Sequence, residues 1–274
     1  MAAMRVHDPR LTEVFEDLLS TLRNFIRKHQ VSHDEYRLAV GFVMETAAKG
    51  EIPLLFDVFL EATVDQVDAV GRAGTETSVE GPFYAPDAPL MKSPCVLPHR
   101  PNEPGDVLFA SGTVRSVDGE PLGSAMLDMW QTDAQGAYSH FNIPEKQAPW
   151  NLRARVIADE NGKFEVQTWV PSPYQIPKDG PTGVLLKGIG RHAWRPAHLH
   201  LRITHPACET LTTQLFFTGD PWIDSDVVGA VKQSLIVSLK KHEDRADLQK
   251  RGVDKPYCTI SYDFALPRLI RKAA

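Results

Sequence analysis

Two histidines separated by one residue are the clearest sign of chemistry in this sequence of 274 residues. His198 and His200 follow the segment 195–197, Arg-Pro-Ala. On a β-strand, residues two apart share a face, so both imidazoles would point to one side while Leu199 and Leu201 enter the core. The pair could bind a metal ion through two nitrogens. The chain has ten histidines, so a chance pair, with one imidazole packed in the core and the other solvated, explains the spacing about as well as a metal site does.

The remaining ligands decide which metal such a pair would bind. Zinc in a hydrolase would need a third histidine, a carboxylate or a cysteine, and a 2-His-1-carboxylate ferrous site would need one Asp or Glu. Spacing shows neither, but Tyr138 and Tyr174 lie in turn-rich segments. A phenol has a pKa near 10, so only a strong Lewis acid such as Fe(III) ionises it near neutrality. Two tyrosines with two histidines indicate Fe(3+). Each tyrosine alone is better explained by packing, so a zinc hydrolase and a non-catalytic β-sandwich binding module stay open.

Helical periodicity dominates the first seventy residues. Apolar residues form a helical stripe within 11–26. Ser32 and Glu35 make a capping box for a second helix that Gly50 ends, and a third helix is expected over 53–70.

Short strands are expected after Gly74, where proline and glycine recur every few residues. Asp118-Gly119 predicts a hairpin between the first two strands, and a helix is expected at Asp224–Val237. The predicted strands are Val107–Val117, Ala125–Thr132, Phe164–Val170, His198–Thr204, Thr210–Phe217 and Cys258–Phe264. This order favours an α+β protein, with a helical domain over 1–90 and a mainly antiparallel β-sandwich domain over 91–274.

Composition favours a small-molecule partner. The net charge of −5 and the lack of a Lys/Arg block argue against nucleic-acid binding. The sequence contains no apolar run of about 18 residues, so no membrane span is predicted. The first thirty residues lack a signal pattern, and Cys95, Cys208 and Cys258 are odd in number and far apart, which fits a reducing cytoplasm. We expect these cysteines to be partly buried and without a catalytic role.

Five ordered segments resemble one enzyme family. They are Thr77–Tyr84, Gly136–Phe141, Pro173–Pro181, Trp194–His200 and Thr213–Phe217. Together they resemble the intradiol ring-cleavage dioxygenases, specifically the catechol 1,2-dioxygenase branch. The resemblance runs from Leu11 to Pro267. It implies that the helical segment over 1–90 is a linker and dimerisation domain and that the β-sandwich over 91–274 is the catalytic domain.

The resemblance assigns a role to each metal-ligating candidate. It implies Fe(3+) held by Tyr138 and His198 as equatorial ligands and by Tyr174 and His200 as axial ligands, with hydroxide in the fifth place. A catechol dianion would displace Tyr174, which can then accept a substrate proton. The ring would be cleaved by O2 to a cis,cis-muconate that keeps both oxygen atoms.

The resemblance also places residues around the substrate. Arg195 would lie over the ring and stabilise developing negative charge, and Gln214 would assist. The wall residues would be Leu54, Asp57, Val58, Val79, Gly81, Pro82, Phe83, Tyr84 and Val227. This mostly apolar wall suits catechol and disfavours protocatechuate. Chlorocatechols and methylcatechols stay open, and Asp57 could meet the third hydroxyl of hydroxyquinol.

The helical segment predicts a homodimer. Its first two stripes offer more apolar surface than a short linker domain can bury alone. In the family these helices also line an apolar tunnel that holds a phospholipid, so a bound lipid is a further expectation.

Overall fold

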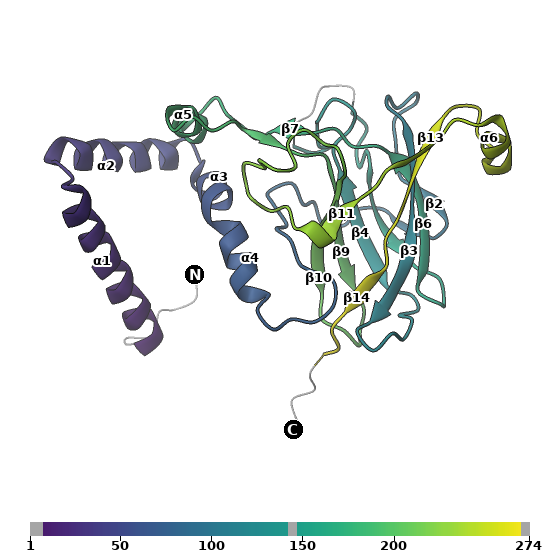
Figure 1. The fold of residues 1–274 in the computed structure, drawn as a ribbon, viewed down its shortest axis with the longest axis horizontal. Coiled ribbons are helices and arrows are strands. Elements are labelled where there is room, and N and C mark those ends of the chain that lie inside the picture. The colour runs from purple at the N-terminus through teal and green to yellow at the C-terminus, as the bar shows by residue number, and fades with distance from the viewer. Residues whose placement is uncertain (1–7, 142–146, 270–274) are drawn as a thin grey trace. The chain divides into compact units, whose positions relative to one another are not determined.

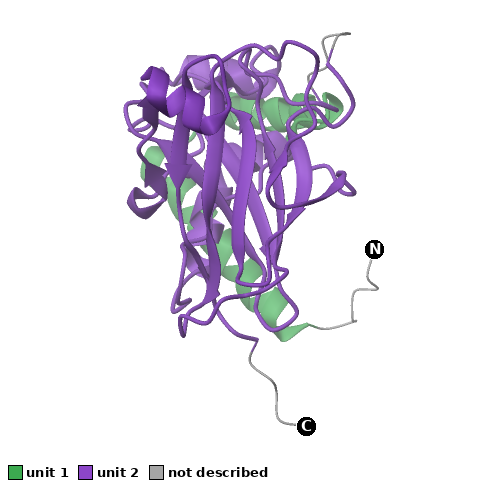
Figure 2. Cartoon of the chain, turned by 90° about the vertical axis from the view of Figure 1, so that its right-hand side faces the viewer, with its two compact units in different colours: residues 1–52 green, residues 53–274 purple. Residues whose placement is uncertain are grey.

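The computed structural model describes residues 8–141 and 147–269. The chain forms two compact units, residues 1–52 and 53–274 (Figure 2). The sequence predicted a boundary at residue 90. The division falls earlier because the segment after the third helix hydrogen-bonds to the sandwich, as where the Ser78 N–H donates to the Thr212 carbonyl at 3.0 Å.

The first unit contains helices α1, Pro9–His29, and α2, His33–Ala48. The Asp8 side chain caps α1, and the predicted capping box of Ser32 and Glu35 starts α2. Along α1, seven large apolar side chains are 42–54% exposed: Leu11, Val14, Phe15, Leu18, Leu22, Phe25 and Ile26.

The third predicted helix begins at the last residue of the first unit, continues into the second unit and is interrupted. It consists of α3, Ile52–Phe56, a π-helical turn, Asp57–Glu61, and α4, Ala62–Asp68. Single π-turns inside helices often occur at functional sites, because the extra residue changes which side chains face a neighbour.

Two stacked sheets form the body of this unit (Figure 1). The first sheet has the order β1, Leu90–Lys92; β5, Arg153–Ile157; β4, Met126–Gln131; β9, His198–Thr204; β10, Leu211–Phe217; and β11, Ile236–Val237. The second has β12, Lys240–His242; β13, Tyr257–Ser261; β3, Val107–Ser116; β6, Lys163–Trp169; and β2, Cys95–Val96, with β14, Phe264–Leu266, beside β3. The longest pairs, β3 with β6 and β9 with β4 and β10, are antiparallel. The predicted α+β class is confirmed.

Further short strands, a 3-10 turn and two helices complete the unit. Strands β7, Tyr174–Gln175, and β8, Trp194–Arg195, form a two-stranded pair, and a 3-10 turn covers Gln233–Leu235. The helices are α5, Pro181–Gly188, and α6, Arg245–Arg251.

The core lies between the two sheets, and alternation along the strands separates it from the opposite face. Leu199 and Leu201 of β9 belong to this core, as do Leu127 and Met129 of β4. Each fully buried side chain of this size stabilises the fold by about 1.5–3 kcal/mol. The residues between them point away from the core, so the outer face of the first sheet is free for polar and aromatic groups.

The predicted hairpin of β3 and β4 is wrong, because these strands belong to different sheets. The Asp118-Gly119 turn does form, and Pro121 bridges back to Arg115. The pairing then stops, since Ser124 adopts a positive φ of 61° and the chain crosses to the first sheet.

The helix predicted at Asp224–Val237 is also wrong. Turns precede the 3-10 turn and β11 there. The Asp226 carboxylate accepts the backbone N–H groups of Val228 and Ala230, and Gly229 has a φ of 70°. Such local bonds from an Asp side chain compete with helical hydrogen bonds.

The cysteines are free, and burial raises the pKa of each thiol. Cys208 and Cys258 lie in the core and Cys95 packs against it, as expected. None of the helices that the structure describes is long and apolar enough to cross a membrane.

Candidate metal centre and substrate cavity

Strand β9 presents His198 and His200 on the face of the first sheet that lies opposite the core. In the neighbouring strands, Trp130 of β4 and Gln214 of β10 are in register with His200. The indole of Trp130 stacks on the His200 ring, with centroids 4.6 Å apart and planes 8° apart. The predicted shared face is confirmed, and the sheet fixes the orientation of His200.

Two loops bring the tyrosines to this face. Tyr174 lies in β7, directly opposite Arg195 of β8. Tyr138 follows a tight turn in which the Asp133 carboxylate accepts the N–H groups of Gln135 and Ala137. The two phenol rings are perpendicular, with centroids 5.3 Å apart.

Gly136 allows the two loops to meet. Its φ is 77°, a backbone conformation that residues other than glycine rarely adopt. A Cβ at this position would lie 3.1 Å from both the Pro173 carbonyl oxygen and the Tyr174 Cβ. The close approach of these loops therefore depends on glycine.

Donor atoms from three of the four predicted ligands lie close together. The Tyr138 Oη atom is 3.2 Å from His198 Nε2 and 3.0 Å from His200 Nε2, and the two Nε2 atoms are 3.0 Å apart. The Tyr174 ring lies beside this set, with its centroid 5.3 Å from that of Tyr138 and 5.8 Å from that of His198. Donor atoms about 3 Å apart could bind one ion together, because metal–ligand bonds are about 2.1 Å long.

Burial keeps both imidazoles neutral. It lowers the pKa of His198 to about 3, with a further contribution from the Arg195 charge, and it lowers the pKa of His200 well below its ordinary value. The His198 Nδ1 donates to the Pro196 carbonyl at 2.8 Å, which leaves Nε2 with a free lone pair. Neutral imidazoles with one oriented lone pair are metal ligands.

Burial shifts the pKa values of the two phenols in the opposite direction, which also favours their neutral form. Burial raises the pKa of Tyr138 well above its ordinary value, and the neighbouring Tyr174 adds to this effect. Burial also raises the pKa of Tyr174, although the Arg195 charge opposes it. A bound cation would reverse these shifts, because it favours the ionised phenolates.

Comparison with known proteins identifies the family of the chain. Residues 79–267 match the family model described as "Dioxygenase", and residues 8–76 match "Catechol dioxygenase N terminus". The chain belongs to the intradiol ring-cleavage dioxygenase family. It is 40% identical to a chlorocatechol 1,2-dioxygenase of Rhodococcus opacus over 85% of this chain and 91% of that protein. It is 33% identical to a catechol 1,2-dioxygenase of Acinetobacter baylyi over 96% and 87%.

A solved structure of a third member has the same fold. The hydroxyquinol 1,2-dioxygenase of Pseudomonas putida DLL-E4 aligns with a TM-score of 0.85 at 34% identity, covering 96% of this chain and 93% of that one. The resemblance in the sequence is thereby confirmed at the level of the family, while its members act on several catechols.

The metal of an intradiol dioxygenase is non-haem iron, and phenolate and imidazole donors suit ferric iron. In residues 8–141 and 147–269, no group of three His, Cys, Asp or Glu side chains could hold a metal ion. The ligand set of a hydrolytic zinc site or of a 2-His-1-carboxylate site is therefore absent from this described part of the chain.

A narrow cavity lies beside the candidate iron ligands, and Tyr174 and Arg195 face it. Seven predicted wall residues line it: Leu54, Asp57, Val58, Val79, Gly81, Pro82 and Phe83. Tyr84 and Val227 lie outside this lining. The Tyr84 hydroxyl donates to Asp128 at 3.0 Å, and Val227 is buried in the apolar cluster behind the cavity.

Three residues that the sequence did not single out also line the cavity: Glu61, Ile176 and Val228. Glu61 follows Asp57 by four residues on the interrupted helix, so its spacing could have indicated a shared face. Its buried Oε2 atom has no hydrogen-bond partner among the described residues. Burial, then the Asp57 charge, raises the pKa of Glu61.

Asp226 and Arg153 are further buried charges that sequence reasoning missed. Arg195 donates to Asp226 through Nε at 3.1 Å and to Gln214 Oε1 through Nη2 at 3.0 Å. Arg153 donates to the Phe83 carbonyl at 2.7 Å and lies 5.6 Å from the Tyr138 ring centroid. Burial lowers the pKa of Arg153 to about 10.

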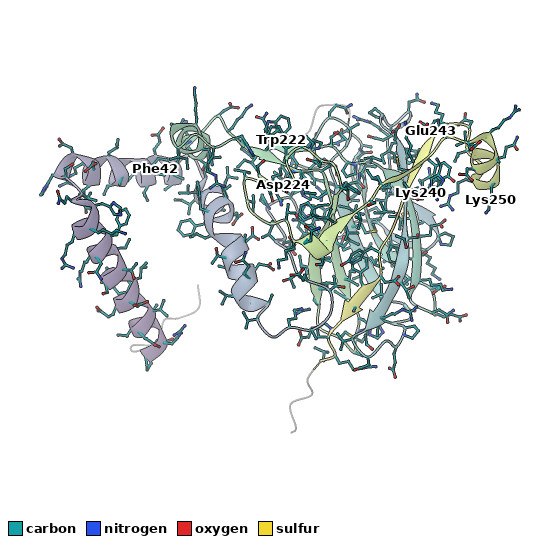
Figure 3. All side chains as sticks on the ribbon, in the orientation of Figure 1. Phe42, Trp222, Asp224, Lys240, Glu243 and Lys250 are labelled. Atoms are coloured by element: carbon teal, nitrogen blue, oxygen red, sulfur yellow. The ribbon has the colours of Figure 1, made fainter. Side chains whose placement is uncertain are left out.

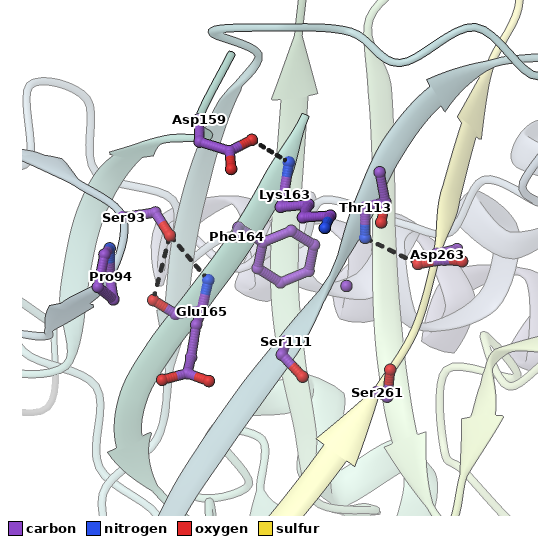
Figure 4. Close-up of a pocket in the computed structure, with 11 residues that line it drawn as sticks. Ser93, Pro94, Ser111, Thr113, Asp159, Lys163, Phe164, Glu165, Ser261 and Asp263 are labelled. Atoms are coloured by element: carbon purple, nitrogen blue, oxygen red, sulfur yellow. Dashed lines mark hydrogen bonds between the residues drawn. The ribbon is translucent and has the colours of Figure 1, made fainter. Parts of the chain in front are cut away.

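A wider hollow lies over the second sheet (Figure 4). It has a volume of about 500 Å³, and its lining includes Asp159, Lys163, Glu165 and Asp263. Asp159 and Asp263 accept backbone N–H groups of β6 and β3. These carboxylates thus serve the strand ends, and none of the predicted site residues lies there.

Proposed function

We propose that this intradiol dioxygenase is a catechol 1,2-dioxygenase that cleaves catechol with O2 to cis,cis-muconate. The observation that carries the proposal is the convergence of Tyr138, Tyr174, His198 and His200 in one buried cluster beside an apolar cavity. In this proposal the four side chains hold Fe(3+), which acidifies the catechol and accepts electron density from it.

The chain's own residues would do the remaining work. Tyr174 is the displaceable phenol and the acceptor for a catechol proton, because it lies at the cavity wall. Arg195 is positively charged and fixed beside Tyr174, so it can stabilise negative charge that develops on the ring. Gln214 holds Arg195, and its amide donates to the Val79 carbonyl of the wall at 2.6 Å.

The apolar wall supports catechol or a lightly substituted catechol. Leu54, Val58 and Phe83 offer no hydrogen bonds to a carboxylate, so protocatechuate would lose its solvation without compensation.

A second candidate is a chlorocatechol 1,2-dioxygenase, favoured by the 40% identity to such an enzyme, because chlorine needs only apolar space. The wall carboxyls Asp57 and Glu61 favour hydroxyquinol as the remaining alternative.

The test combines metal analysis with substrate ranking. We expect about one iron per chain, a red colour from tyrosinate-to-iron charge transfer, and an ultraviolet-absorbing muconate product. Stoichiometric zinc in a colourless protein would refute the iron centre, and a yellow semialdehyde would refute intradiol cleavage. The kcat/KM values for catechol, 4-chlorocatechol and hydroxyquinol decide among the three substrates.

We further propose a cytoplasmic homodimer formed through the helical region. The half-exposed apolar side chains of α1 support such an interface, since exposed apolar patches mark association surfaces. A phospholipid that co-purifies with the dimer is part of the same proposal and would be detected by mass spectrometry of an organic extract.

A further inference from the structure

We propose that Asp226 is a positioning residue for ring cleavage, which acts by fixing the guanidinium of Arg195 and the cavity wall at Val228. The inference rests on the proposed role of Arg195.

Asp226 and Arg195 form a buried two-point ion pair. Nε of Arg195 donates to Oδ1 of Asp226 at 3.1 Å, and Nη2 donates to Oδ2 at 3.2 Å. The Asp226 side chain is 2% exposed and the Arg195 side chain 3%. A two-point contact fixes the plane of a guanidinium as well as its place. The side chain of Arg195 can therefore not rotate without breaking two charged hydrogen bonds.

The pair aims the remaining guanidinium nitrogen toward the metal centre. Nη1 of Arg195 lies 3.5 Å from His198 Nε2, and Arg195 lines the cavity together with Tyr174. Gln214 of β10 accepts a hydrogen bond from Nη2 at 3.0 Å. A charge that is already in place stabilises developing negative charge without reorganisation, which is the most effective arrangement for catalysis.

The same carboxylate builds part of the cavity wall. Oδ1 accepts the Val228 N–H at 3.3 Å, and Oδ2 accepts the Ala230 N–H at 3.1 Å. The Ala230 carbonyl in turn accepts the Ser78 hydroxyl, next to Val79 of the wall. Asp226 thus connects the Arg195 guanidinium to two segments of the apolar wall, and so fixes the position of the charge relative to the cavity.

A double-mutant cycle tests this role. The variants are Asp226→Asn, Arg195→Gln and their combination, with Asp224→Asn as the matched control. Asp224 is an exposed carboxylate two residues away on the same loop (Figure 3). Asparagine keeps one oxygen that can accept backbone N–H groups but removes the charge that holds Arg195.

We expect Asp226→Asn to lower kcat about 30-fold with KM changed less than threefold. Removal of an electrostatic stabiliser costs about 10²–10³ in kcat, and the loss here is smaller because Arg195 is kept and only its position is disturbed. In the Arg195→Gln background the same change should lower kcat less than twofold. Asp224→Asn should leave kcat and KM unchanged. Asp226→Glu, which restores the charge at a longer reach, should recover part of the lost kcat.

Thermal unfolding of the metal-free protein gives a readout independent of turnover. Asp226→Asn leaves a buried guanidinium with less compensation, so its Tm should fall by roughly 5–10 °C, and by much less in the Arg195→Gln background.

Additive losses of kcat in the cycle, or a loss equal to that of Asp224→Asn, would overturn the proposal. If Asp226→Asn does not fold, a value of kcat for Asp226→Glu no higher than that of Arg195→Gln alone would also overturn it, since the restored charge would then have recovered nothing. A wild-type protein that cleaves none of the catechols would instead refute the proposed function.

Discussion

Replacing Gly136 with alanine tests whether the approach of two loops positions the tyrosines. The positive φ of 77° alone should cost about 1–2 kcal/mol. The added Cβ would lie 3.1 Å from the Pro173 carbonyl oxygen and the Tyr174 Cβ, well inside the optimum of about 3.5–4.0 Å. Overpacking of this kind costs a further 1–3 kcal/mol, approximately. The total of about 2–5 kcal/mol should lower the Tm by roughly 4–20 °C, at about 2–4 °C per kcal/mol.

Gly219→Ala is the matched control. Gly219 has a φ of 87° and no atom within 4 Å of an added Cβ, so it carries the backbone strain without the contact. Only Gly136→Ala should shift the visible band of the iron form, because only there does the methyl group displace Tyr174. Identical spectra and equal Tm losses in the two variants would refute the reasoning.

Three other outcomes are expected. Tyr174→Phe should keep its iron and lose most of its kcat, while His198→Ala should lose the metal, and equal iron content and activity in both would contradict the assigned roles. Glu61→Gln should raise the free energy of unfolding near pH 7. The pKa of Glu61 in the native protein lies above its ordinary value, so above about pH 4.5 the native protein binds more protons than the unfolded protein. The stability of the wild type therefore falls as the pH rises through this window. Chemical denaturation of Glu61→Gln should show a flatter pH dependence than wild type, and exposed Glu45→Gln should not. Light scattering should give twice the chain mass of 30.5 kDa, and a mass equal to one chain would exclude the dimer.

Features that depend on neighbouring residues could be predicted from the sequence. The capping box of Ser32 and Glu35 involves residues three apart, and the alternation of His198 and His200 with core leucines follows from the geometry of any strand. The four candidate donors could be named from the sequence only with the help of the resemblance to a known family, since each tyrosine alone is better explained by packing.

Tertiary structure decided what depends on residues far apart in the chain. The partner of β3 is β6 rather than β4, because sheet pairing is chosen by burial of a whole face and not by the turn that precedes it. Asp226 looked like part of a helix, yet its charge is compensated by Arg195, 31 residues away. The approach of Tyr138 to the histidine nitrogens likewise required the packing of a loop on the outer face of a sheet. Local patterns determine which groups are present, and only long-range packing sets the distances at which they act.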